Sequence, residues 1–565
     1  MHKISKTLIK NISPQIDKGK YPVKWEIDIP FSVTATINSN DISFQVFLRY
    51  KRESNKDWQS LEMKQTGQGK YSAEFVANQI GSYLYTIEVN SNGKSTRYDR
   101  IFSVYFHRPQ ARYAAWYEMW PRSQGKIEGK SATFKDMEAR LPEIHKMGFD
   151  TLYLAPIYPV GRTNRKGPNN TLNAKPNDPG SPFSIGNEYG GHKAINPELG
   201  TLDDLKRFAK KANQLGIEIV LDIALTCSPD HPYVKEHPDW FFYNEDGTIK
   251  YAENPPKKYQ DVYPLNFYPK DKNEMWNEMK SIFLFWIKQG VKTFRVDNPH
   301  TKPVEFWQWL IKEIQAKYPD TIFLAEAFTE PPMMKLLAKI GFTQSYTYFT
   351  WRNTKQELTE YLTELTQSEM KYYFRGNLFT NTPDILMPIL QEGGRPAFKM
   401  RIALATTLSS LYGMYNGFEL CENKAIPGTE EYMNSEKYQY KVWDWDRPGN
   451  IKDYITKLNK IRRENSALHY YRNLKFYNSS DENVIFYGKT SYDKQNTVFI
   501  AVNLDPFNIH SSILRIPIEH FGIAENEEYE IEELITGKVF KWKGSESEIE
   551  LNPNEEPAMI FKIKK

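Results

Sequence analysis

Apolar and polar positions follow three successive patterns along the chain, and the first covers residues 1–108. Short runs in this part alternate apolar with polar residues, for example residues 31–35, 42–48 and 83–89, and turn residues such as Asn92-Gly93 separate them. An alternation with a period of two is typical of a β-strand that has one buried face. We therefore expect residues 1–108 to form an N-terminal β-sandwich.

The second pattern, over residues 109–466, alternates strand-like runs with helical ones. One helical stripe has apolar residues three or four positions apart, at Met137, Leu141, Ile144 and Met147. An apolar run at residues 151–155 follows it, and later runs end at Asp297, at Glu326, near Phe349 and near Thr380. About eight strand–helix units occur, which predicts an α/β fold with a (β/α)8 TIM barrel.

Two further regions complete the predicted organisation. Residues 227–264 lack clear periodicity and are rich in proline, asparagine and aromatic residues. A loop of this length inside a compact domain is usually functional, so we expect a subdomain inserted after the third strand. Alternation with a period of two returns over residues 467–565, for example at 483–487 and 497–502, and predicts a C-terminal β-sandwich.

Composition excludes several classes of protein. The 565 residues carry a net charge of +4 and no Lys/Arg-rich run, which argues against a nucleic-acid partner. The only two cysteines, Cys227 and Cys421, exclude a disulfide framework and fit a reducing compartment. No apolar stretch is long enough to cross a bilayer and no signal peptide is visible, so we expect a cytoplasmic protein without a membrane partner.

The strand that ends at Asp297 carries the first candidate chemistry. Arg295 and Asp297 lie two positions apart, so both side chains point to the same face of a strand. In a barrel this face is the interior, where an isolated charge is costly and has to be paired. A catalytic Asp297 at the strand's C-terminal end and a purely structural Arg–Asp pair both explain the segment.

Two more carboxylates follow apolar strands. Glu326 ends the run 321–325, and Asp384 follows the run that ends near Thr380. Taken singly, each is explained by an exposed acid at a strand end or in a turn. Together with Asp297, however, they place three carboxylates at the same end of three barrel strands. Two carboxyl groups about 5 Å apart across a glycosidic bond are the equipment of a retaining mechanism.

The order of these three acids on successive strands resembles the alpha-amylase superfamily. Longer stretches are closer to one family within it, the alpha-1,4-glucan:maltose-1-phosphate maltosyltransferases. The similar stretches are YEMWPRS at 117–123, RKGPNNT at 165–171, CSPDHP at 227–232, AENPPKKYQD at 252–261, RVDNPHTKP at 295–303 and NTPD at 381–384. The resemblance extends from the first predicted sandwich to the C-terminus.

The resemblance implies a role for each acid. Asp297 would be the nucleophile, Glu326 the general acid/base and Asp384 the group that stabilises the distorted sugar. Arg295 would keep Asp297 ionised, because a nearby cation favours the charged carboxylate.

The resemblance also implies two sets of substrate contacts. The phosphate-binding positions correspond to Asn254, Lys257, Tyr259, Asn298 and Ser181. Lys166 and Asn170 correspond to contacts with the donor sugar. From the residues alone, these positions are equally well explained as solvated loop, turn or packing residues.

Three departures from related sequences qualify the resemblance. Amylases usually carry Asn-His near the end of the third strand and a His before the third acid, where this chain has Thr226-Cys227 and Pro383. Their absence implies a differently built donor site. Maltosyltransferases usually carry a helical insert in the N-terminal sandwich that helps to form a dimer, whereas residues 83–106 are β-like here. We therefore expect a monomer, or a homodimer through another surface.

The predicted function is a retaining transfer of maltose from maltose 1-phosphate to the non-reducing end of an alpha-1,4-glucan acceptor, with release of inorganic phosphate. No metal and no organic cofactor are implied. A hydrolase or transglycosylase acting on neutral maltooligosaccharides is the first alternative, and a non-catalytic glucan-binding protein is the second. The missing histidines and the Asn254-Lys257-Tyr259 group argue against the first, and the complete set of acids argues against the second.

Overall fold

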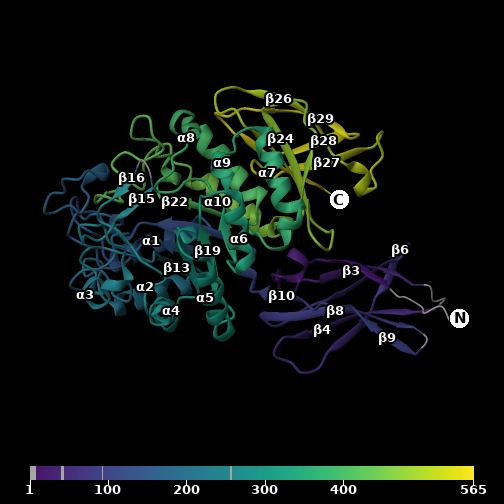
Figure 1. Cartoon of the computed structure of the whole chain (residues 1–565). Coiled ribbons are helices and arrows are strands. Elements are labelled where there is room, and N and C mark those ends of the chain that lie inside the picture. The colour runs from purple at the N-terminus through teal and green to yellow at the C-terminus, as the bar shows by residue number, and fades with distance from the viewer. Residues whose placement is uncertain (1–7, 40–42, 92, 255–256, 565) are drawn as a thin grey trace.

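The computed structural model describes residues 8–39, 43–91, 93–254 and 257–564 (Figure 1). Three parts of the chain considered above lie outside these residues: the N-terminal residues 1–6, Asn92 of the predicted turn, and Pro255 and Pro256 of the similar stretch 252–261. No helix among the described residues is long and apolar enough to cross a membrane.

A closed barrel of parallel strands lies at the centre, as the sequence predicted. Its strands, in order around the barrel, are β11 (Ala114–Met119), β12 (Thr151–Leu154), β13 (Glu218–Ile223), β18 (Thr293–Asp297), β19 (Ile322–Glu326), β20 (Gln344–Tyr346), β21 (Gly376–Phe379) and β22 (Leu411–Tyr415). Large inward-facing side chains fill its interior, including Trp116, Tyr153 and Tyr346. The interior is therefore a packed core and leaves the site to the strand ends.

Helices surround the barrel (Figure 1). They are α1 (Phe134–Lys146), α2 (Leu202–Gln214), α4 (Lys272–Lys288), α5 (Val304–Lys317), α6 (Pro331–Ile340), α7 (Lys355–Gln367), α8 (Pro388–Glu392), α9 (Gly394–Leu408) and α10 (Lys452–Glu464). The apolar stripe predicted from Met137, Leu141, Ile144 and Met147 is buried, because it is the face by which α1 contacts the core.

Three long segments follow the C-terminal ends of strands and build the site. They cover residues 155–201, 224–271 and 416–451. The middle segment contains α3 (Pro232–Glu236) and the short strands β14 (Thr226–Cys227), β15 (Ala252–Asn254), β16 (Lys257–Tyr259) and β17 (Tyr263–Pro264). Of the three segments, the sequence predicted only the middle one, from the lack of periodicity over residues 227–264. Figure 1 shows the β15–β16 hairpin on the side of the molecule away from the N-terminal strands.

The N-terminal strands form two sheets. One contains β1 (Leu8–Ser13), β3 (Phe31–Asn38), β7 (Lys70–Phe75) and β6 (Lys64–Gly67); the other contains β2 (Val23–Glu26), β10 (Phe102–His107), β8 (Gly81–Ser91), β4 (Gln45–Arg52), β5 (Gln59–Glu62) and β9 (Lys94–Arg97). Phe31 packs edge-on against Tyr85 and Phe106, so the sheets share one core. Within the described part of residues 8–108 there is no α-helix, and the segment 83–106 is folded as β8, β9 and β10.

The C-terminal strands also form two sheets. A six-stranded sheet contains β23 (Leu474–Tyr477), β24 (Val484–Thr490), β25 (Thr497–Asn503), β30 (Ala558–Ile563), β27 (Glu528–Glu533) and β28 (Val539–Lys543). A second, two-stranded sheet pairs β26 (His510–Arg515) with β29 (Glu546–Leu551). Phe486, Leu514 and Phe561 belong to the buried core that joins them.

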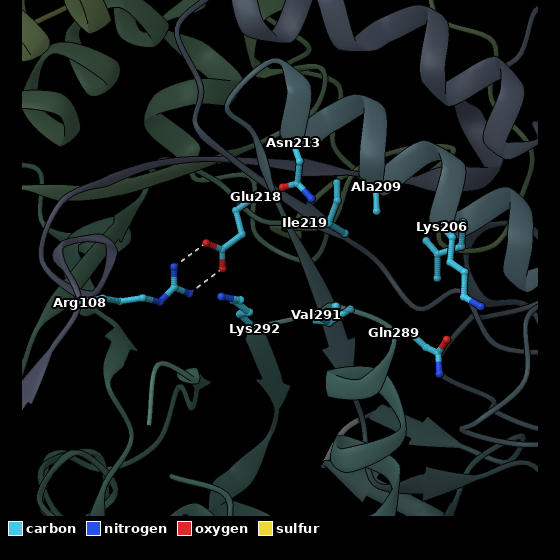
Figure 2. Close-up of a pocket in the computed structure, with 11 residues that line it drawn as sticks. Arg108, Lys206, Ala209, Asn213, Glu218, Ile219, Gln289, Val291 and Lys292 are labelled. Carbon is cyan, nitrogen blue, oxygen red and sulfur yellow. Dashed lines mark hydrogen bonds and ion pairs between the residues drawn. The ribbon is translucent and has the colours of Figure 1, made fainter. Parts of the chain in front are cut away.

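A pocket of about 250 Å³ lies at the opposite, N-terminal end of the barrel strands (Figure 2). Arg108 lines this pocket, and two of its guanidinium nitrogens donate to the carboxylate oxygens of Glu218, at the start of β13, at 2.6 and 2.7 Å. The same guanidinium donates to the Thr293 hydroxyl at the start of β18, at 2.8 Å. The bonds of Arg108 therefore anchor the segment that enters the barrel. The chemistry is expected at the other, C-terminal ends of the strands.

A buried carboxylate links all three parts of the chain. Glu26 of β2 accepts hydrogen bonds from Arg375, just before β21, and from Arg472, just before β23, each at 2.7 Å. Burial opposes ionisation of Glu26, but the guanidiniums of Arg472 and Arg375 lower its pKa to about 2. The ion pairs therefore hold the N-terminal sheet against the barrel and the C-terminal strands.

We expect Glu26→Ala to lower the free energy of unfolding by about 3–5 kcal/mol at pH 7, because two buried guanidiniums lose their partner. The folded-state pKa lies below the ordinary value of 4.5, so this contribution is present above about pH 4.5 and is lost as the pH falls towards 2. Chemical unfolding of both proteins at pH 7 and at pH 3 measures it. Glu464→Ala, which removes an exposed pair with Lys460, is the control and should change stability by less than about 0.5 kcal/mol. Equal losses in the two variants would contradict the assignment.

Candidate active site

Two of the predicted acids end neighbouring barrel strands. Asp297 at the end of β18 and Glu326 at the end of β19 are direct partners in the parallel ladder. Adjacent strands lie about 4.8 Å apart, so the register alone brings the two carboxyl groups close together. Each side chain is 15 % exposed at the C-terminal mouth of the barrel. A ligand in the mouth can therefore reach both.

Arg295 lies beneath both acids. Its guanidinium donates to Asp297 at 2.8 Å and lies 3.5 Å from Glu326. It also donates, at 2.9 Å, to Asp222 of β13, which is fully buried. Phe294 points the opposite way and packs against Phe283 of α4. β18 therefore has the charged inner face and the apolar outer face that the sequence predicted.

Asn298, like Arg295, binds both Asp297 and Glu326. Its backbone N–H donates to Glu326 at 3.1 Å, and its side-chain amide donates to Asp297 at 3.2 Å. Asn298 makes these bonds from a left-handed backbone, with φ of 43° and ψ of 52°, a region that residues with a side chain seldom adopt. The Asn298 carbonyl is held by the Thr301 hydroxyl at 2.8 Å and by the Lys302 ammonium at 3.3 Å.

The protonation of Glu326 is set by its surroundings. Burial and the neighbouring Asp297 carboxylate raise the pKa of Glu326 to about 7, while Arg295 opposes that rise. A carboxyl group with a pKa near neutrality can both give and take a proton at physiological pH. Burial likewise raises the pKa of Asp222 to about 7, again against the influence of Arg295.

The third acid has its own cation. Lys437, in the segment after β22, donates to Asp384 at 2.7 Å. Although burial acts in the opposite direction, the Lys437 ammonium lowers the pKa of Asp384. Glu436, the residue before Lys437, is fully buried and accepts from the Tyr415 hydroxyl at 2.5 Å and the Asn416 amide at 2.7 Å. This anchored Glu436 fixes the place of Lys437.

A cavity of about 780 Å³ opens beside Asp384 and is lined by several predicted contact residues. Lys257 forms an ion pair with Glu431. Lys166 is buried, and its ammonium donates to the Gln260 side chain at 2.5 Å, while burial lowers its pKa. The side-chain oxygen of Asn170 is buried without a hydrogen-bond partner, so it is free to accept a ligand hydroxyl.

The remaining predicted contacts are placed differently. Tyr259 ends β16, and burial raises the pKa of its hydroxyl. Ser181 is buried, accepts from the backbone N–H of Phe183 at 3.3 Å and does not line the cavity. Asn254 ends β15, but its side chain is outside the described part of the structure. Among the described residues no group of three or more His, Cys, Asp and Glu side chains could hold a metal ion.

Sequence reasoning missed four charged residues of this site. They are Asp222, Lys302, Glu431 and Lys437. Asp222 is the penultimate residue of β13 and follows the apolar run 219–221, so a signal like that of Glu326 was present in the sequence. Glu431 and Lys437 lie in the segment 416–451, whose length between strand and helix was the available signal.

Three family models match the chain. They are "Alpha-1,4-glucan:maltose-1-phosphate maltosyltransferase, domain N/S" at residues 5–96, "Alpha amylase, catalytic domain" at residues 118–375 and "GLGE, C-terminal" at residues 476–563. Together they extend over most of the sequence.

Relatives that carry the name alpha-1,4-glucan:maltose-1-phosphate maltosyltransferase are similar over most of the chain. That of Rhodospirillum rubrum is 56% identical over 461 residues, covering 82% of this chain and 67% of the relative. That of Myxococcus xanthus is 42% identical over 650 residues, covering 99% and 97%.

Solved structures show the same fold at low identity. A maltogenic alpha-amylase from Thermotoga neapolitana superposes with a TM-score of 0.61 at 22% identity, over 80% of this chain and 99% of that one. An alpha-amylase from Geobacillus thermoleovorans in complex with acarbose gives a TM-score of 0.63 at 17% identity, with the same coverage. At this identity the likeness concerns the fold.

We expect Arg295→Met to destabilise the fold more at pH 8 than at pH 5. At pH 8 the variant leaves buried carboxylates without a cation, which costs about 3–5 kcal/mol. Arg295 opposes the rise of the Asp222 and Glu326 pKa values, so both rise further without it. A folded-state pKa above the unfolded one gives stability that is present at low pH and lost as the pH rises, so the deficit shrinks on acidification. Chemical unfolding of wild type and variant at both pH values measures this, and a pH-independent deficit would contradict it.

Proposed function

The chain belongs to the family of alpha-1,4-glucan:maltose-1-phosphate maltosyltransferases, and from this premise we propose how its own residues perform the transfer. Maltose 1-phosphate is the donor, the non-reducing end of an alpha-1,4-glucan is the acceptor, and inorganic phosphate is released. The observation that carries the proposal is the pair of carboxyl groups of Asp297 and Glu326 on neighbouring strands, above one shared guanidinium.

In the first step, an oxygen of Asp297 attacks the anomeric carbon of the donor. The bond from this carbon to the phosphate oxygen breaks, and Glu326 gives its proton to the departing phosphate. A Glu326 pKa of about 7 supports the acid role, since much of the group carries a proton at neutral pH. Arg295 at 2.8 Å keeps the Asp297 carboxylate in place.

In the second step, Glu326 takes a proton from the 4-hydroxyl of the glucan. The hydroxyl oxygen forms the new bond to the anomeric carbon, and Asp297 leaves as a carboxylate. Two displacements restore the original configuration, so the product is again an alpha-linkage. Carboxyl groups about 5 Å apart belong to this two-step mechanism, and adjacent strands give that separation.

The substrate contacts divide between sugar and phosphate. We assign Lys166 and Asn170 to the donor sugar, because a buried ammonium and an unpaired buried amide oxygen both lie in the cavity wall. Asp384 stabilises the distorted sugar and stays ionised beside Lys437. We assign the phosphate to Lys257, which lines the cavity. Tyr259, Asn298, Asn254 and Ser181 are its neutral donors on the resemblance alone, since Ser181 lies outside the cavity wall.

Incubation with maltose 1-phosphate and maltohexaose tests the proposed reaction. We expect free phosphate to appear in equal amount to the maltosyl groups transferred, and products to lengthen by two glucose units at a time. Reducing sugar released from starch, with no phosphate released from maltose 1-phosphate, would contradict the proposal and indicate a hydrolase. Binding of maltohexaose without any turnover of either donor would indicate a glucan-binding protein.

We expect Lys257→Ala to impair the phosphorylated donor selectively. Hydrogen bonds to charged groups contribute roughly 1.5–3 kcal/mol, so kcat/KM for maltose 1-phosphate should fall about ten- to a hundredfold. Alpha-maltosyl fluoride carries no phosphate and should be much less affected. Steady-state kinetics with both donors measure the difference.

The matched control is Lys258→Ala. Lys258 lies on the same hairpin, and its ammonium is 3.8 Å from Glu253 rather than bound to Glu431. We expect it to leave the ratio of the two donors within about twofold of wild type, as is usual for an exposed ion pair. Equal losses on both donors in Lys257→Ala would mean that Lys257 supports the fold or the sugar instead of the phosphate.

A further inference from the structure

Three cations at the cavity and the barrel mouth have carboxylate partners, whereas the ammonium of Lys166, assigned above to the donor sugar, donates to Gln260. Lys257 is paired with Glu431, Lys437 with Asp384, and Arg295 with Asp222 and Asp297. A phosphate dianion that binds one of these three cations therefore has to draw it away from a carboxylate. The relative ease of breaking each pair decides where the phosphate binds.

The cations in these pairs differ in how far their side chains are exposed to solvent. The side chains of Arg295 and Lys437 are only 9 % and 12 % exposed, so these two cations are held within the protein, although Asp384, the partner of Lys437, is 49 % exposed. The Lys257 side chain is 41 % exposed. Ion pairs in contact with water are weak and exchange partners at little cost, whereas breaking a buried pair is expensive. Lys257 is therefore the cation that can be exchanged.

Glu431 is the fixed member of this pair. It lies in a small loop closed by pairing of Ala425 with Tyr432. The carbonyl of Glu430 accepts from the backbone N–H of Leu386 at 2.6 Å, and the Tyr432 hydroxyl accepts from the Asn381 amide at 2.7 Å. Lys257 in contrast carries its ammonium on a four-carbon stem with several rotatable bonds. The ammonium can leave and return while the carboxylate stays.

We propose that Glu431 determines specificity by competing with phosphate for Lys257. This inference rests on the proposed function of Lys257 as the phosphate ligand. When the donor binds, the Lys257 ammonium moves to the phosphate. When inorganic phosphate leaves, Glu431 takes the ammonium back, and the vacated space favours the uncharged glucan end.

The competition matters because the maltosyl-enzyme has two possible acceptors. In the forward direction the glucan 4-hydroxyl attacks. In the reverse direction an oxygen of inorganic phosphate forms the bond to the anomeric carbon, Asp297 leaves as a carboxylate, and Glu326 takes the phosphate proton. A Lys257 without Glu431 would retain phosphate and favour this reverse attack. Glu431 thus biases the enzyme towards glucan elongation by weakening the competitor.

Glu431→Gln tests the inference, since it removes the charge and keeps the shape. We expect inorganic phosphate to inhibit transfer from alpha-maltosyl fluoride roughly two- to tenfold more strongly than in wild type, because the competing ion pair is gone. Exchange of radiolabelled inorganic phosphate into maltose 1-phosphate should accelerate by a similar factor. A damaged fold would weaken phosphate binding, so a gain is specific to the proposed role.

Two further variants sharpen the test. Glu253→Gln makes the same charge change on the β15–β16 hairpin but beside Lys258, and we expect phosphate inhibition to stay within about twofold of wild type. In a Lys257→Ala background, Glu431→Gln should have no effect, because the residue through which it acts is missing.

The outcomes distinguish this inference from the proposed function. Unchanged or weaker phosphate inhibition in Glu431→Gln would overturn the role of Glu431. If Lys257→Ala still impaired only the phosphorylated donor, the proposed function would stand. A Lys257→Ala variant that loses both donors equally would overturn the phosphate site and the role of Glu431 together.

Discussion

The site depends on one buried cation shared by carboxylates from three adjacent strands. Arg295 points into the barrel and binds Asp222 of β13 and Asp297 of its own strand, with Glu326 of β19 close by. Without it, the barrel mouth would hold several unpaired anions in a place where burial penalises charge by several kcal/mol each. The guanidinium therefore allows the carboxyl groups proposed as nucleophile and as acid/base to coexist side by side.

Charge pairing extends outward from this cation and becomes weaker as exposure increases. At the cavity wall Asp384 pairs with Lys437, whose side chain is 12 % exposed, whereas Glu431 pairs with Lys257, whose side chain is 41 % exposed. The buried pairs fix geometry, whereas the exposed pair can respond to a charged ligand. One electrostatic rule thus accounts both for the arrangement of the acids and for the exchangeable phosphate contact that we propose at Lys257. The strained backbone of Asn298 adds a rigid link between the two reacting groups.

The sequence predicted the parts of this arrangement that depend on local periodicity. Alternation along β18 placed Arg295 and Asp297 on the inner face, and apolar runs located the ends of β19 and β21. The pairs Lys257–Glu431 and Asp384–Lys437 join segments distant in sequence, and no local pattern encodes such a contact. Similarly, only the resemblance to a family singled out Lys257 and Asn170, because a polar loop residue has no distinctive local signature. The bond from the Asn298 backbone to Glu326 also escaped prediction, since it joins residues 28 positions apart on neighbouring strands.

The central claim is that Asp297 forms the covalent bond to the sugar, and trapping that intermediate tests it most directly. In Glu326→Ala, alpha-maltosyl fluoride can still react, because fluoride leaves without a proton, but no base remains to activate the acceptor. Proteolysis and mass spectrometry of the reacted variant then locate the modification. We predict a maltosyl group on the peptide that contains Asp297, and its loss when Asp297 is also replaced by Ala. A maltosyl group on another residue, such as Asp384, would contradict the account.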